Sequence, residues 1–214
     1  MRRERGRDAR AAPIAEDEPM SPPPPFYFGV MSPYSWLAAE RIEELLPQAR
    51  WRGVLAGVVF AAHGRTSWGL TERRAEGLAD CEARAAARGL GPLAWPRDWP
   101  TSDLHAGRAM IFADRLGLLH QFALAAMRMA FREGADLAER GVVLEAGRRA
   151  GIDAGDLGDA LADPEVKLQL RALNDEALAA GVFGVPTVIV DGELFWGDDR
   201  LEDAAAALRL KGAG

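Results

Sequence analysis

The stretch FYFGVMSPYSWLA, Phe26 to Ala38, decides the first part of the fold. Its apolar beginning is typical of a buried strand, which ends where Ser32 and Pro33 follow. Proline fits the first turn of a helix, and we expect this helix to run to about Leu46, before Pro47. Serine is common just before a helix, so Ser32 is predicted to cap it, although the same position also suits a catalytic hydroxyl.

The next segments alternate between strand and helix signals. Trp51 to Phe60, rich in valine and leucine, is predicted as a second strand. It would be a parallel neighbour of the first strand, joined to it by a right-handed crossover. From Thr71 to Ala180 the pattern contains helices only. Strand signals return at Thr187 to Val190 and Leu194 to Trp196, joined by a tight Asp191-Gly192 turn.

A last helix, from about Asp199 to Leu210, closes the chain. This order indicates an α/β protein with a helical insertion. Residues 26–70 and 181–214 would form the α/β domain, and residues 71–180 the inserted helical domain. Residues 1–25 carry many charges, little to bury and a run of prolines, so they are predicted to be a disordered tail.

Composition excludes several classes of protein. The chain has 214 residues, a formal net charge of -6 and a single cysteine. Cys81 alone allows neither an intramolecular disulfide nor a Cys-x-x-Cys pair, and its acidic neighbours in a helix predict an inert, packed thiol. The negative charge argues against nucleic acid, and no apolar segment is long enough for a membrane span. We therefore expect a cytoplasmic protein.

Two stretches carry a resemblance to a known family. One is Phe26 to Ala38 with its Ser32-Pro33-Tyr34-Ser35, and the other is GVFGVPTVIVDGELFWGDDRL, Gly181 to Leu201. They resemble the 2-hydroxychromene-2-carboxylate isomerases and the kappa-class glutathione transferases, in the DsbA-like branch of the thioredoxin superfamily. The resemblance extends from about Phe26 to Leu210. It implies a thioredoxin-like fold with an inserted all-helical domain.

The resemblance gives Ser32 a possible catalytic role. In DsbA-like redox enzymes the first helix begins with a cysteine pair, where the positive helix end lowers a thiol pKa. Serine occupies that corner here, so the protein cannot supply the thiolate itself. The resemblance implies that glutathione, or another low-molecular-weight thiol, brings the sulfur and that Ser32 donates a hydrogen bond to it. The hydroxyl can cap the helix at the same time.

Pro186 stands before a strand rich in valine and isoleucine, where a central strand would not tolerate proline. Either this strand lies at an edge, or the preceding bond is special. The resemblance implies a cis peptide between Val185 and Pro186, with the Val185 backbone pairing with the cysteinyl backbone of the thiol. The alternative is a trans proline at the entrance of a strand.

Asp198 and Asp199 stand at the start of the last helix. Carboxylates in a first helical turn are commonly caps or partners of the helix dipole. The resemblance implies a second role, in which this step holds the γ-glutamyl group of the thiol. An aspartate would accept from the ammonium, while helix N-H groups hold the carboxylate. Which aspartate meets the ammonium stays open.

The resemblance also implies a substrate pocket, for which Tyr34, His63, Trp95 and Trp99 are the candidate residues. His63 follows the second predicted strand, and it either lines the pocket or is a loop histidine without a role. Trp95 and Trp99 of the WPRDWP loop either form flat walls for an aryl substrate or cap the helical core. No metal site is expected, because the histidines lack ligand spacing.

The chain also departs from the family pattern. Isomerases of this family usually carry an aspartate in the first strand, where Gly29 stands. They commonly carry an asparagine after the second strand, where this chain reads His63 to Ser67. Both positions are near the expected pocket. They leave the thiol-binding frame intact and leave the substrate and the thiol open.

The leading hypothesis is a glutathione-dependent isomerase of the 2-hydroxychromene-2-carboxylate type. A bound thiolate would add to an unsaturated aryl pyruvate and leave after bond rotation. The alternatives are a kappa-type glutathione transferase or peroxidase, and a cysteine-less module that binds a thiol or peptide. A dithiol oxidoreductase is excluded, because neither Ser32 nor Ser35 is a cysteine. The expected partners are a small aromatic substrate and, because related proteins are dimers, a second copy of the chain.

Overall fold

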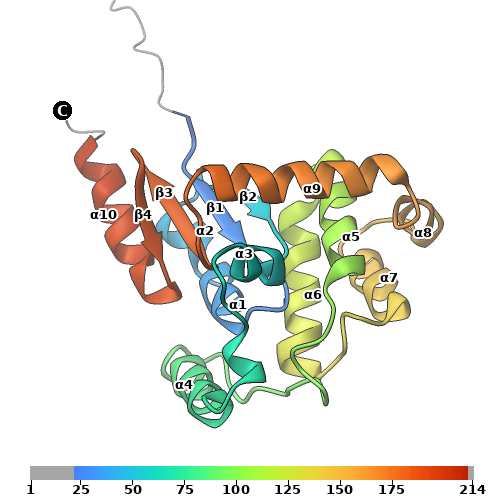
Figure 1. The fold of residues 1–214 in the computed structure, drawn as a ribbon, viewed down its shortest axis with the longest axis horizontal. Coiled ribbons are helices and arrows are strands. Elements are labelled where there is room, and N and C mark those ends of the chain that lie inside the picture. Colours follow the sequence, from blue (N-terminus) through green and yellow to red (C-terminus); the bar gives the residue numbers. More distant parts are fainter. Residues whose placement is uncertain (1–21, 212–214) are drawn as a thin grey trace, which may run out of the picture.

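The computed structural model describes residues 22–211, which form a four-stranded sheet with helices around it (Figure 1). The strand order is β2-β1-β3-β4. β1 (Pro25–Phe28) is parallel to β2 (Arg50–Gly53) and antiparallel to β3 (Thr187–Val190), which is antiparallel to β4 (Glu193–Trp196). The predicted parallel pair and the predicted hairpin are both confirmed. β3 is a central strand.

The helices are α1 (Pro33–Ala39), α2 (Ile42–Leu45), α3 (Ala56–Ala62), α4 (Arg74–Ala87), α5 (Leu104–Arg115), α6 (Leu119–Glu133), α7 (Arg140–Arg149), α8 (Ala154–Ala160), α9 (Pro164–Ala179) and α10 (Leu201–Lys211), with short 3-10 helices η1 (Trp68–Leu70) and η2 (Asp198–Arg200). None of these described helices is long and apolar enough to cross a membrane.

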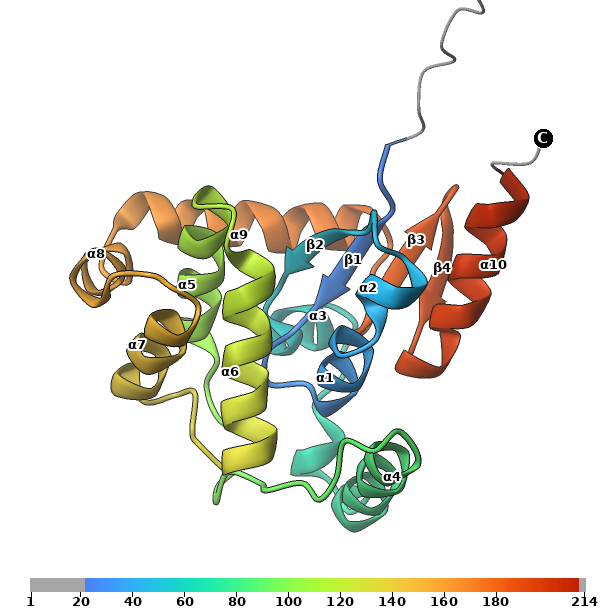
Figure 2. The same cartoon turned by 180° about the vertical axis from the view of Figure 1, so that it is seen from behind.

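Both faces of the sheet are buried. Phe26, Phe28 and Val188 belong to the large core that also contains residues of α1, α6 and α10. Tyr27 points to the opposite face, where a second core packs against α3 and α9. Figures 1 and 2 show α5 to α8 gathered beside the sheet and α4 standing apart below α1. The predicted α/β fold with a helical insertion, in the thioredoxin arrangement, is confirmed.

The first helix is shorter than the sequence predicts. α1 ends at Ala39, and a separate turn of helix, α2, begins at Ile42. Glu40, between them, accepts a hydrogen bond from Trp36 Nε1 at 2.8 Å and pairs with Arg128 of α6 at 2.6 Å. These contacts hold Glu40 against α6, and the turn that follows lets Ile42 become buried.

The second strand is also shorter than predicted. β2 ends at Gly53, and residues 56–62 form helix α3 instead of continuing the strand. Ala56 and Val59 are buried while Val58 is exposed, which is the three-residue spacing of a helix face and not the alternation of a strand. Tertiary contact with α9 thus outweighs the strand preference of valine.

The hairpin strands and the last helix lie where the sequence predicts them, with shifts of one or two residues at their ends, and the first turn of the last helix is the 3-10 helix η2. Asp191 (φ 51°) and Gly192 (φ 81°) both have positive φ, as the tight hairpin turn requires. The predicted tail over residues 1–25 falls mostly outside the described residues. Its last part is ordered, because Pro25 begins β1 and the Arg50 N-H donates to the Pro24 carbonyl at 2.9 Å.

Asp103, just before α5, gives the fold a pH-dependent element. Burial raises the pKa of its carboxyl to about 6. The folded state therefore binds more protons than the unfolded state between about pH 4 and 6, so the raised pKa lowers stability as pH rises through this range. We predict that Asp103→Asn raises the free energy of unfolding at pH 7.5 by about 1–3 kcal/mol.

Urea unfolding at pH 4.5 and 7.5 tests this prediction. The wild type should lose stability between the two pH values relative to the variant. An identical pH dependence of both proteins would contradict the assignment to Asp103.

Candidate functional site

One edge of the sheet collects the residues that the sequence singles out. β1 and β3 pair through Phe26 and Val188, so the end of β1 lies opposite the residues that enter β3. Ser32 follows β1, while Val185 and Pro186 precede β3. The Gly197 N-H donates to the Pro186 carbonyl at 2.9 Å, which brings the start of η2 to the same edge.

Ser32 is the N-cap of α1, as predicted. Its Oγ accepts a hydrogen bond from the Ser35 N-H at 3.2 Å, and the residue is nearly buried. Ser35 is fully buried, and its own Oγ accepts from the Gly29 N-H at 3.2 Å. The hydroxyl hydrogen of Ser32 is donated to no other residue of the described chain. Ser32 therefore caps the helix and keeps a donor free.

The Val185–Pro186 peptide is cis, as the resemblance implied. The Val185 side chain is packed in the second core, against the α3 and α9 side of the sheet. Within residues 22–211, neither the N-H nor the carbonyl of Val185 takes part in a hydrogen bond. An N-H and a carbonyl without a partner, at the point where the chain enters a strand, are groups that an extended ligand can pair with.

Asp198 and Asp199 have different surroundings. Asp198 is 1% exposed and lies between two arginines of α4 and its end: Arg84 Nη1 is 2.9 Å from its Oδ1, and Arg88 pairs with its other oxygen. The Asp199 side chain is 57% exposed, with Oδ2 3.3 Å from Arg84. The oxygens of Asp198 are thus occupied within the protein, while Asp199 faces solvent.

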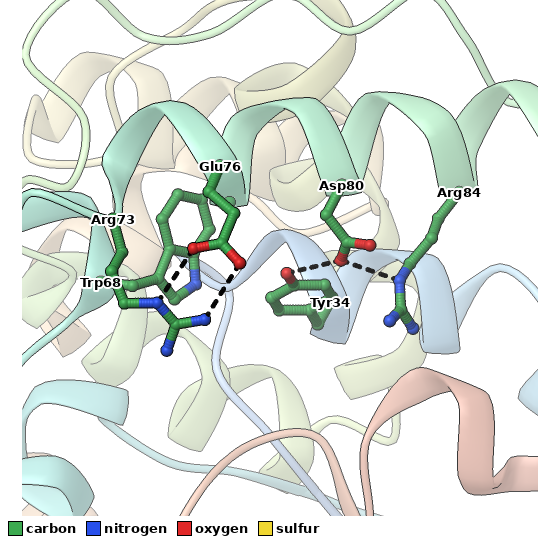
Figure 3. A pocket seen from close by; sticks show the side chains of 7 residues that line it. Tyr34, Trp68, Arg73, Glu76, Asp80 and Arg84 are labelled. Atoms are coloured by element: carbon green, nitrogen blue, oxygen red, sulfur yellow. Dashed lines mark hydrogen bonds and ion pairs between the residues drawn. The ribbon is translucent and has the colours of Figure 1, made fainter.

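A hollow of about 420 Å³ lies between α1, η1 and α4 (Figure 3). It is lined by Tyr34, Trp68, Arg73, Glu76, Gly77, Asp80 and Arg84. The Tyr34 hydroxyl donates to Asp80 Oδ2 at 2.8 Å, and Arg84 Nε donates to the same oxygen at 2.9 Å. Arg84 therefore belongs both to this hollow and to the ion pairs of Asp198 and Asp199.

The ionisable groups beside the hollow stay neutral where they are buried. Burial raises the pKa of the Tyr34 phenol above its ordinary value, so the hydroxyl keeps its hydrogen and donates it to Asp80. Burial also raises the pKa of the Cys81 thiol to about 12. The prediction of a packed thiol is confirmed, since Cys81 is fully buried. A neutral thiol is a poor nucleophile.

Of the four predicted pocket residues, only Tyr34 lines the hollow. Trp99 is buried behind Trp68, with ring centroids 4.8 Å apart, and donates to the Met31 carbonyl at 3.0 Å. The Trp95 ring is tilted against the Trp99 ring, with centroids 5.0 Å apart, and does not line the hollow. His63 is exposed at the end of α3, where its Nδ1 lies 3.0 Å from the Val59 carbonyl.

Sequence reasoning missed Trp68 and the charged side chains of α4. Arg73, Glu76, Asp80 and Arg84 are spaced by three or four residues, which places them on one face of a helix. This spacing is visible in the sequence, and it would have indicated a polar face that borders a cleft. Trp68 gives no such signal, because a single tryptophan in a loop is compatible with many roles.

Comparison with known proteins shows the family. Residues 25–209 match the model of the DSBA-like thioredoxin domain, and the chain belongs to this family. It is 28% identical over 187 residues to the 2-hydroxychromene-2-carboxylate isomerase of Sphingobium xenophagum, which covers 83% of this chain and 93% of that protein. It is 29% identical over 206 residues to the human glutathione S-transferase kappa 1, with 88% and 91% covered.

Solved structures support the same fold. A 2-hydroxychromene-2-carboxylate isomerase superposes with a TM-score of 0.77 at 21% identity, covering 89% of this chain and 97% of the other. The cytosolic disulfide reductase DsbM from Pseudomonas aeruginosa, solved with GSH, superposes with a TM-score of 0.61 at 17% identity, covering 89% and 99%.

The two aspartates provide a test of the ion pairs. Asp198→Asn leaves Arg84 and Arg88 without their buried partner charge, so we predict a loss of about 3 kcal/mol in the free energy of unfolding. Asp199→Asn removes an exposed carboxylate and should change it by less than about 1 kcal/mol. Urea denaturation measures both values. Equal effects of the two substitutions would contradict the structural role of Asp198.

Gly77 tests the packing of Trp68. A Cβ at Gly77 would overlap the Trp68 ring, whereas a Cβ at Gly57 of α3 meets nothing within 4 Å. Both glycines lie in helices, so alanine adds about 1 kcal/mol of helix propensity at each position. We predict that Gly57→Ala stabilises the protein, while Gly77→Ala does not and shifts tryptophan fluorescence. Equal stabilisation with unchanged fluorescence would contradict the described contact.

Proposed function

We propose that the protein is a thiol-dependent isomerase of the 2-hydroxychromene-2-carboxylate type, with glutathione as the thiol. One observation carries the proposal. Ser32 caps α1 and has a hydroxyl hydrogen that no described residue accepts, and it stands at the start of the first helix, where DsbA-like redox enzymes carry a cysteine. The only cysteine of the chain, Cys81, is buried. The similarity to an isomerase over 93% of that protein's length supports the same reading.

The residues present fit a thiol of the glutathione type. Ser32 would donate its free hydroxyl hydrogen to the sulfur, since charge-assisted hydrogen bonds are about twice as strong as neutral ones. The backbone N-H and carbonyl of Val185 would pair with the cysteinyl residue. Asp199 would accept from the ammonium, because it is exposed. Asp198 would position η2, because both of its oxygens are held by arginines.

The hollow beside α1 would hold the substrate. The Trp68 ring offers an apolar wall for an aryl group. The Arg73 guanidinium, whose Nε already pairs with Glu76 at 3.1 Å, would offer its remaining N-H donors to a carboxylate. The bound thiol would supply the nucleophile that adds to the unsaturated carbon of an aryl pyruvate and leaves after bond rotation. Tyr34 keeps its hydroxyl hydrogen and stays fixed on Asp80, so it would shape the pocket without exchanging a proton.

A transferase of the kappa type is the second candidate. It is favoured by the 29% identity to the human kappa 1 transferase over 206 residues. The thiol would occupy the same groups, but it would be consumed, whereas an isomerase returns it. The free thiol concentration after many turnovers therefore distinguishes the two reactions.

Calorimetric titration tests the thiol site. We predict saturable binding of glutathione to the wild type and a loss of about tenfold in affinity for Ser32→Ala and for Asp199→Ala. Ser102→Ala and Asp175→Ala, which replace exposed residues of the same types outside this edge, should bind like the wild type. No binding to the wild type at millimolar glutathione would overturn the glutathione proposal.

Turnover tests the reaction. Isomerisation of an unsaturated aryl pyruvate should require glutathione, should fall by about 10²-fold in Ser32→Ala, and should leave the free thiol concentration unchanged. Stoichiometric loss of thiol would favour the transferase. Binding of glutathione without turnover on any electrophile would favour the cysteine-less binding module.

A further inference from the structure

A second hollow, of about 370 Å³, lies at the end of the sheet where β1 begins. The chain enters β1 at this end, while Ser32 and α1 follow the other end of the strand (Figure 1). The lining of the second hollow comes from residues 22–25, the beginnings of β1 and β2, the turn between β3 and β4, α9 and α10. The proposed thiol site uses none of these segments.

The walls of the second hollow are largely apolar and stiff. One wall is the proline run, residues 22–25, whose rings fix the backbone and leave it without N-H donors. The Arg50 N-H donates to the Pro24 carbonyl at 2.9 Å, which fastens this run to β2. Ile189 of β3 and Leu208 of α10 add aliphatic surface. Such walls suit the apolar body of a small molecule.

Both carboxylates of the lining already have partners. Tyr27, which is 2% exposed, donates its hydroxyl hydrogen to Glu176 Oε1 at 3.3 Å, and Arg52 pairs with the other oxygen of Glu176. Burial and the nearby Glu176 raise the pKa of Tyr27, so it keeps this hydrogen. Asp191 pairs with Lys211. Neither carboxylate therefore needs a cation from a ligand.

Arg50 is the cation of the lining that has no such partner. It is exposed, and within residues 22–211 its guanidinium takes part in no ion pair or hydrogen bond. The lining holds three cations and two carboxylates, which leaves one positive charge in excess, although the whole chain has a net charge of -6. A guanidinium with free donors can bind a carboxylate through two parallel hydrogen bonds.

We infer that the second hollow binds a small apolar carboxylate of one or two rings, whose charge pairs with Arg50. A volume of about 370 Å³ can hold a body of this size, and the proline and aliphatic walls remove it from water. One free guanidinium balances a single negative charge, whereas a phosphate brings more charge and no apolar body. The inference is independent of the proposed function, because Ser32, Val185 and Asp199 do not line this hollow.

Methyl NMR of the isoleucines in the full chain tests the inference, with 2-naphthoate as the probe. Of the four isoleucines that the structure describes, only Ile189 lines the second hollow, while Ile42, Ile111 and Ile152 are buried elsewhere. We predict that 2-naphthoate shifts the Ile189 δ-methyl signal, assigned with Ile189→Val, in a saturable way and leaves the other three in place. The neutral 2-naphthamide should bind about tenfold more weakly.

Replacement of Arg50 tests the role of its charge. Arg50→Gln should bind 2-naphthoate about tenfold more weakly than the wild type and no better than the amide. Arg171→Gln, which replaces an exposed arginine of α9 outside the lining, should behave like the wild type. Thermal melts check that each variant is folded.

Two results would overturn the inference. One is an Ile189 signal that stays in place at millimolar 2-naphthoate, including the case in which calorimetry detects binding elsewhere in the protein. The other is an Arg50→Gln variant that keeps the full preference for the carboxylate over the amide.

Discussion

The buried ion pairs of Asp198 join the two parts of the molecule. Asp198 follows the hairpin of the sheet, while Arg84 and Arg88 come from α4 and its end in the helical insertion. A carboxylate that is 1% exposed needs such partners, because an unpaired buried charge is costly. Arg84 also binds Asp80 and lies over the Tyr34 ring at 5.4 Å. One arginine thus sets the position of the hollow relative to the edge of the sheet.

In this part of the molecule, one of two neighbouring polar side chains is held by contacts within the protein, and the other is available to a ligand. Of two adjacent carboxylates, the first is neutralised within the protein and the second faces solvent. Of two nearby serines, Ser35 is buried under the backbone of Gly29, while Ser32 keeps a hydrogen to donate. The helix that Ser32 caps has only 7 residues, so its dipole contributes less than a long helix would. The hydroxyl and the free backbone of Val185 therefore carry most of the proposed interaction with a thiol.

Much of the fold was predictable from local signals. The Ser32-Pro33 junction and the Asp191-Gly192 turn each use residues that favour the conformation found there, so both were predicted in the correct place. The prediction of a strand from Val54 to Phe60 was wrong. Valine favours strands locally, but contact with α9 stabilises a helix in this segment. The hollow was harder to predict from the sequence. Its walls come from α1, η1 and α4, and only the structure shows which distant segments meet. Trp95 and Trp99 were chosen for their chemistry, yet Trp99 is buried in contact with Trp68, and neither tryptophan lines the hollow.

The pKa of glutathione bound to the protein is the most direct test of the central claim, that Ser32 stabilises a borrowed thiolate. It can be measured from the ultraviolet absorbance of the thiolate as a function of pH, with protein in excess over glutathione. The account predicts a bound pKa at least about one unit below the roughly 8.5 of an ordinary cysteine thiol, and a return toward that value in Ser32→Ala. A bound pKa equal to that of free glutathione would contradict it.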